Sequence, residues 1–125
     1  MSRILINQAT GEPVVENLLV ATSAPARLRG LLGRRSLPKD TGMLLLPCRS
    51  IHMWFMQFPI DAAFLDADRR VLKIRRNLQP WRIGRAPRHT RCVLETAAGV
   101  LDRVQPGDVL TAPEPITERS GGFDR

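Results

Sequence analysis

Short apolar runs at close spacing, each ended by a turn-forming residue, restrict the fold of this chain more than any other feature. After Gly42 the runs cover residues 43–46, 51–56, 60–65, 71–74, 93–96 and 109–111. Proline, glycine and aspartate separate them, and no helix-length pattern alternates with them. This succession predicts a mainly β domain of the α+β class, with an antiparallel sheet that curls or closes into a small β-barrel.

The same pattern predicts which segments lie where in the sheet. Residues 51–56 and 60–65 are apolar at successive positions, so we expect both to be central strands that are covered on two faces. The segment Asp66–Arg69 is expected to be a β-turn, and Ala98–Val104 a brief helix.

The N-terminal third predicts a hairpin followed by the principal helix. Strands are expected at 3–7 and 14–20, joined by the turn residues between them. Ser23 then offers an N-cap, leucines follow at helical spacing, and Gly33 is a suitable end. A short helix over 23–33 follows from these signals.

The length of 125 residues fits one compact domain, which we place at residues 1–112, with a flexible tail at 113–125. No apolar run approaches the roughly 20 residues that cross a bilayer, and the first residues do not read as a signal peptide. These features predict a cytoplasmic protein without a transmembrane segment.

Positive charge is concentrated in one stretch. The formal net charge is +7, and residues 69–91 contain nine lysines and arginines and no acid. Such a block is typical of polyanion binding, for which the candidates are Arg75, Arg76, Arg82 and Arg85. The alternative is a solvated face in an arginine-rich chain.

The cysteines and histidines form two short pairs, Cys48 with His52 and His89 with Cys92. Two sulfurs and two nitrogens are a suitable ligand set for zinc. However, residues three or four apart on a strand do not converge, so we predict reduced thiols and no metal site.

Several ordered pieces of the sequence carry a family resemblance. They include residues 27–34, 42–46, 51–56, 58–61, 64–66, 80–82, 93–95, 98–99 and 107–108. Taken together, these pieces resemble the domain-of-unknown-function family 192 over about residues 3–111. The resemblance implies a compact β-barrel-like domain with a short helix. It implies no activity and transfers no catalytic residue.

Seven residues are candidates for a ligand site on the sheet: His52, Trp54, Met56, Asp61, Glu95, Trp81 and Arg82. The first three share one face of an extended strand, and the last two are expected at a basic rim. A carboxylate among apolar neighbours needs a partner or a cavity. For Asp61 we expect a structural partner, either Arg27 or Arg29 of the predicted helix or backbone N–H groups.

These observations favour a non-catalytic domain that binds a small molecule or a protein. One alternative is a small hydrolase that uses Asp61 or Glu95 with His52, and another is a polyanion-binding module at residues 69–91. No nucleophile elbow, Walker loop or dinucleotide fingerprint is present, so no cofactor is expected. Trp81 is the only aromatic side chain within the basic block, which argues against specific binding of single-stranded nucleic acid.

Overall fold

Strands make up all of the regular secondary structure in the described part of the chain. A computed structural model describes residues 3–21, 36–46, 50–52, 58–80 and 83–113. The strands are β1 (Leu5–Asn7), β2 (Pro13–Val15), β3 (Asn17–Ala21), β4 (Thr41–Leu45), β5 (Ser50–His52), β6 (Ile60–Leu65), β7 (Val71–Leu78), β8 (Ile83–Arg85), β9 (Cys92–Ala97) and β10 (Leu110–Thr111). The prediction of a mainly β fold is therefore confirmed.

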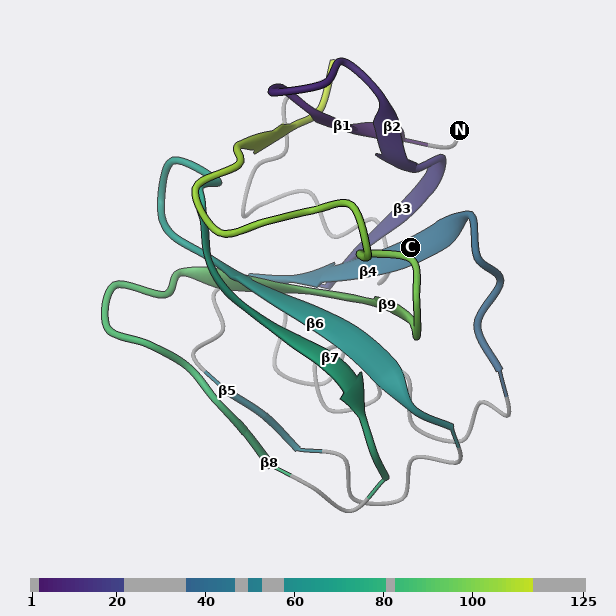
Figure 1. Cartoon of the computed structure of the whole chain (residues 1–125), viewed down its shortest axis with the longest axis vertical. Helices are drawn as coiled ribbons and strands as arrows, with labels where there is room; N and C mark the ends of the chain where they lie inside the picture. Colours follow the sequence, from purple (N-terminus) through teal and green to yellow (C-terminus); the bar gives the residue numbers. More distant parts are fainter. Residues whose placement is uncertain (1–2, 22–35, 47–49, 53–57, 81–82, 114–125) are drawn as a thin grey trace.

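A five-stranded sheet in the order β3-β4-β9-β6-β7 forms the centre of the molecule (Figure 1). Its β4–β9, β9–β6 and β6–β7 pairs are antiparallel, as expected, but β3 and β4 run parallel. Residues 22–40, which connect this parallel pair, are long enough for the crossover that it requires. The described sheets do not close into a barrel, because the large sheet ends at β3 and β7.

Both faces of the large sheet are covered by apolar side chains. The first core, on one face, contains Leu44, Ala63 and Leu94, and the second core, on the other, contains Phe64 and Val93. Because β6 and β9 contribute to both cores, nearly every residue in them is buried. This explains why residues 60–65 are apolar at successive positions, and it confirms them as an interior strand.

The N-terminal hairpin covers the first core. β1 pairs with β2 and β10 in a three-stranded antiparallel sheet, seen above the large sheet in Figure 1. The expected single strand 14–20 is two strands in different sheets, because Glu16 interrupts the strand between β2 and β3. The N–H groups of Glu16 and Asn17 both donate to the Asp40 carbonyl, at 2.8 and 2.9 Å, which fixes the start of β3 beside β4.

The second core faces a two-stranded ribbon of β5 and β8, drawn below the large sheet in Figure 1. Ala86, directly after β8, packs against this core. The expected central strand 51–56 is therefore wrong in its described part, because Ile51 and His52 pair with β8 and not with the large sheet. Residues 53–57 lie outside the described residues.

Residues 98–104 form successive turns in place of the expected brief helix. Each hydrogen bond spans three residues, for example from the Asp102 N–H to the Gly99 carbonyl at 3.2 Å. Gly99 has a φ of 94°, which interrupts helical geometry. The predicted helix 23–33 lies outside the described residues, as does the tail beyond residue 113. In the portion that is described, no helix has the length and apolarity needed to span a membrane.

Candidate functional site

Asp61 of β6 is an internal acceptor of backbone hydrogen bonds. Its side chain is buried, its Oδ1 accepts from the Asn77 N–H at 2.9 Å, and its Oδ2 accepts from the N–H groups of Gly99 and Leu101 at 2.9 and 3.2 Å. Three donors compensate a buried carboxylate for its lost hydration. These contacts correspond to the backbone N–H alternative anticipated for Asp61, whereas Arg27 and Arg29 lie outside the described residues.

Glu95 of β9 faces the other side of the sheet. It lies opposite Met43 of β4 and Ala62 of β6, and both neighbours belong to the second core. Only 6% of Glu95 is exposed, and burial raises the pKa of its carboxyl from 4.5 to about 7. Among the described residues, Glu95 forms no hydrogen bond or ion pair. Near neutral pH, the protonated and the ionised form of this carboxyl are therefore both populated.

Asp61 and Glu95 therefore do not lie in one site. Asp61 lies opposite Thr96, and successive strand residues alternate between faces, so the two carboxylates lie on opposite sides of one sheet. The Asp61 carboxylate also accepts three backbone hydrogen bonds. Of the two carboxylates, Glu95 is the one that lies on the face covered by the second core.

The other residues of the expected ligand site are placed only in part. His52 pairs with Ile83 in the β5–β8 ribbon, and its side chain lies outside the described residues. Trp54, Met56, Trp81 and Arg82 lie outside the described residues.

The basic segment divides between the two faces of β7. Lys73 lies opposite Phe64, and Arg75 lies opposite Ala62, so both side chains project on the side of the second core. Arg76 projects to the first side, where its guanidinium donates to the carbonyls of Leu101 and Val104 at 2.6 and 2.7 Å.

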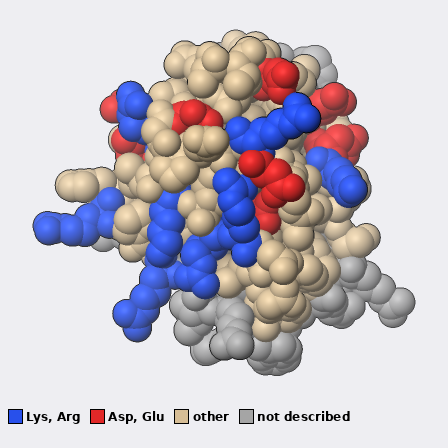
Figure 2. All heavy atoms as spheres, viewed as in Figure 1, with Lys and Arg blue, Asp and Glu red and all other residues tan. Residues whose placement is uncertain are grey.

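Arg76 therefore has a structural role, and because neighbouring strand residues point in opposite directions, its side chain lies on the other side of the sheet from Arg75. Two further arginines, Arg85 and Arg88, are exposed at the end of β8 and in the loop that follows. We define the basic face as Lys73, Arg75, Arg85 and Arg88. Figure 2 shows Lys and Arg side chains gathered on the lower left of this view, while Asp and Glu side chains lie mostly in its upper part.

The cysteine and histidine set is only partly described. Cys92 is fully buried in the first core and lies opposite Leu65, whereas His89 is exposed three residues earlier. Cys48 and the side chain of His52 lie outside the described portion. Within that portion, no group of three or more metal-ligating side chains comes together.

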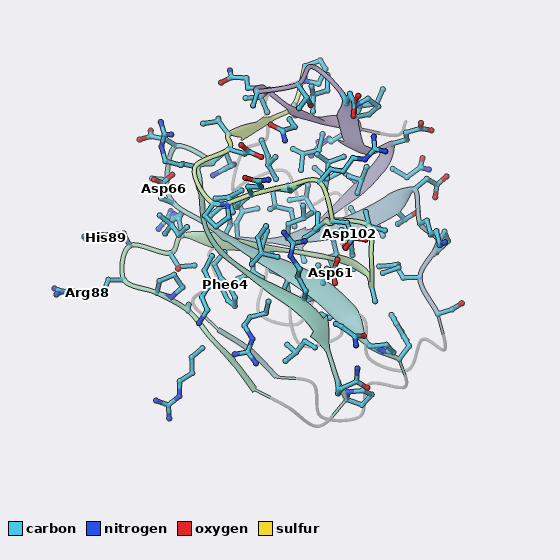
Figure 3. The ribbon with its side chains drawn as sticks, viewed as in Figure 1. Asp61, Phe64, Asp66, Arg88, His89 and Asp102 are labelled. Atoms are coloured by element: carbon cyan, nitrogen blue, oxygen red, sulfur yellow. The ribbon has the colours of Figure 1, made fainter. Side chains whose placement is uncertain are left out.

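An open cleft that the sequence interpretation missed lies between two loops (Figure 3). The turn at 66–68 forms one wall and residues 86–91 form the other, and the cleft has a volume of about 800 Å³. Its ionisable side chains are those of Asp66, Asp68, Arg88, His89 and Arg91. The sequence indicated the first loop only as a turn. The two loops are far apart in the chain and meet because β9 pairs with β6.

Comparison with known proteins places this geometry in a family without an assigned activity. Residues 5–112 match the family DUF192, described as "Uncharacterized ACR". A UPF0127 protein of Thermococcus sibiricus is 32% identical over 107 residues, which cover 79% of this chain and 66% of that protein. A UPF0127 protein of Pyrococcus horikoshii is 28% identical over 82% of this chain and 91% of its own length. The chain thus spans just under two thirds of the Thermococcus relative.

Two crystal structures have the same fold. A protein of unknown function from Novosphingobium aromaticivorans matches with a TM-score of 0.74 and 26% identity, over 87% of this chain and 83% of that one. A putative transcription regulator from Sinorhizobium meliloti matches with a TM-score of 0.70 and 28% identity, over 89% of this chain and 94% of that one.

Proposed function

The chain belongs to the uncharacterised family DUF192, and we propose that it is a non-catalytic binding domain whose partner is a polyanion. The family resemblance read from the sequence is confirmed, and membership brings no catalytic residue with it. The proposal therefore rests on the residues of this chain. It takes up the polyanion-binding alternative of the sequence analysis and assigns it to the basic face.

The observation that carries the proposal is the location of exposed or partly exposed basic side chains from separate elements on one side of the large sheet. Lys73 and Arg75 project from β7 on the side of the second core, and Arg85 ends β8, whose ribbon lies on that same side. Closely spaced cations attract the counterion-shielded charges of a polyanion and displace its bound counterions. The name of the Sinorhizobium structure, a putative transcription regulator, is compatible with nucleic acid as that polyanion.

Binding to a labelled duplex DNA, followed by fluorescence anisotropy between 50 and 200 mM salt, tests the proposal. Four phosphate contacts predict that the logarithm of the binding constant falls against the logarithm of the salt concentration with a slope of roughly −3 to −4. Replacing Arg75 with serine should reduce the steepness of the slope by about 1.

Arg103 supplies the control for this experiment. It is an exposed arginine outside the basic face, 3.9 Å from Glu12, so Arg103→Ser should leave the slope unchanged. Equal losses for the two variants would indicate a response to net charge alone, and the basic face would then have no specific role.

A second candidate is a small molecule held near Glu95. Its support is the position of the Glu95 carboxyl, which is buried and has no partner among the described residues. Glu95 of β9 and Arg75 of β7 both lie opposite Ala62 of β6, so only the Ala62 methyl separates them across the sheet. Such a pair offers a hydrogen-bond donor and a cation to a ligand oxygen. Native mass spectrometry of the purified protein tests this candidate, because a co-purified small molecule should be lost in Glu95→Gln and kept in Asp102→Asn.

A further inference from the structure

The open cleft described above presents opposite charges on two separate walls. Asp66 and Asp68 line the side formed by the β6–β7 turn, and Arg88, His89 and Arg91 line the side formed by the loop before β9. Figure 3 shows Asp66 on one loop and Arg88 and His89 on the other. The volume of about 800 Å³ lies within the range of small-molecule sites.

Both walls are held by hydrogen bonds that do not depend on a ligand. The Asp66 Oδ1 atom accepts from the N–H groups of Asp68 and Arg70, each at 2.9 Å. The Thr90 hydroxyl donates to the Pro87 carbonyl at 2.7 Å, and the Arg91 N–H donates to the Leu65 carbonyl at 2.7 Å. The last bond ties the second wall to the end of β6. The backbone of both walls is therefore fixed before a ligand enters the cleft.

The opposite charges do not neutralise one another across the cleft. In the described part of the chain, neither Arg88 nor His89 forms an ion pair with Asp66 or Asp68. Asp68 and Arg88 are exposed, so their charged groups can bind a partner from solution. A ligand with one sign of charge would be attracted by one wall and repelled by the other. A ligand with both signs satisfies the two walls together.

We propose that this cleft binds a small zwitterion that carries a carboxylate and a protonated amine. The carboxylate lies against Arg88 and His89, which supply N–H donors, and the amine lies against Asp66 and Asp68, which supply acceptors. This site is separate in its chemistry from the basic face. A polyanion gains nothing from two aspartates, whereas the amine of a zwitterion requires them.

Titration of the protein with glycine, diglycine and triglycine, followed by backbone amide NMR, tests the proposal. These probes differ in the distance between their two charges, so the tightest binder reports the span of the cleft. We expect saturable shifts at residues 66–69 and 88–91. Acetylation of the amine or amidation of the carboxylate of that probe should each weaken binding about tenfold, because each removes a charge-assisted contact.

Two variants test the two walls of the cleft, and Asp68→Asn also separates this site from the basic face, because Arg88 belongs to both surfaces. Asp68→Asn and Arg88→Gln should each weaken binding of the tightest probe by about fivefold or more, while Asp102→Asn, which lies outside the cleft, should have no effect. Asp68→Asn should leave DNA binding equal or stronger, because it removes a repelling charge. Absence of saturable shifts at the two segments, equal affinity for capped and uncapped probes, or unchanged affinity in both variants would overturn the proposal.

Discussion

Asp61 and Arg76 bind opposite ends of one residue, Leu101. The Leu101 N–H donates to the Asp61 carboxylate at 3.2 Å, and the Leu101 carbonyl accepts from the Arg76 guanidinium at 2.6 Å. The turns at 98–104 have few backbone partners of their own, so side chains from β6 and β7 provide them. The first core is closed at this point, because Leu101 and Val104 are buried in it.

Asp61→Asn should destabilise the protein by about 2 to 3 kcal/mol. The amide retains one acceptor oxygen, while its NH₂ group faces a backbone N–H that has lost its partner. Urea denaturation at neutral pH measures the effect. Asp102→Asn is the matched control, because its carboxylate is exposed and 4.0 Å from Arg76, and it should cost less than about 1 kcal/mol. Similar midpoints for the two variants would contradict the structural role of Asp61.

Arg76→Gln and Arg75→Gln should have opposite consequences. The first should lower the free energy of unfolding by about 1 to 2 kcal/mol, because it removes two carbonyl contacts of a partly exposed guanidinium, and it should leave DNA binding nearly intact. The second should weaken DNA binding without a comparable loss of stability. Denaturation and anisotropy measured on both proteins provide the comparison. A variant pair that loses binding equally would contradict the division of β7 into two faces.

Glu95 should make the protein less stable as pH rises from about 4.5 to 7. The pKa of its carboxyl is about 7 in the folded protein, whereas 4.5 is its ordinary value, which applies to the unfolded chain. The unfolded chain therefore releases this proton at a lower pH than the folded protein does. The contribution of Glu95 to the free energy of unfolding is fully present below pH 4.5. It is lost as pH rises through the pKa of the folded protein, and the total loss is about 3 kcal/mol.

Glu95→Gln should remove this dependence. The neutral amide has no proton to lose, so the difference in unfolding free energy between pH 5 and 7.5 should shrink by the contribution of Glu95, and the variant should exceed the wild type in stability above pH 7. Urea denaturation at the two pH values measures both effects. An identical pH profile for variant and wild type would show that Glu95 ionises at its ordinary pKa.

Gly42→Ala should destabilise the protein by about 1 to 3 kcal/mol through overpacking. A Cβ atom at this position would lie 3.0 Å from Val15 and 3.2 Å from Leu94, where the N-terminal hairpin meets β4. Thermal unfolding of the variant measures the cost. An unchanged midpoint would mean that the Val15 and Leu94 side chains move aside.

Local signals in the sequence predicted the strands well and their partners less well. The first hairpin, the turn at 66–69 and the buried strand at 60–65 follow from turn residues and apolar patterns, which act over a few positions. The same reasoning extended one strand through Glu16 and placed 51–56 in the large sheet. Both errors concern pairing between distant segments, for which no local pattern carries information.

The amino-acid sequence by itself determined the mainly β class and the family, and it supplied the charged residues from which a site can be built. Tertiary structure decided which of them act together. Strand alternation separates Asp61 from Glu95 and Arg75 from Arg76, although each pair looked like a unit in the sequence or the expected site. The β6–β9 pairing brings Asp66 and His89 to one cleft. Side-chain direction in a sheet follows from register, and register is set by contacts between residues far apart in the chain.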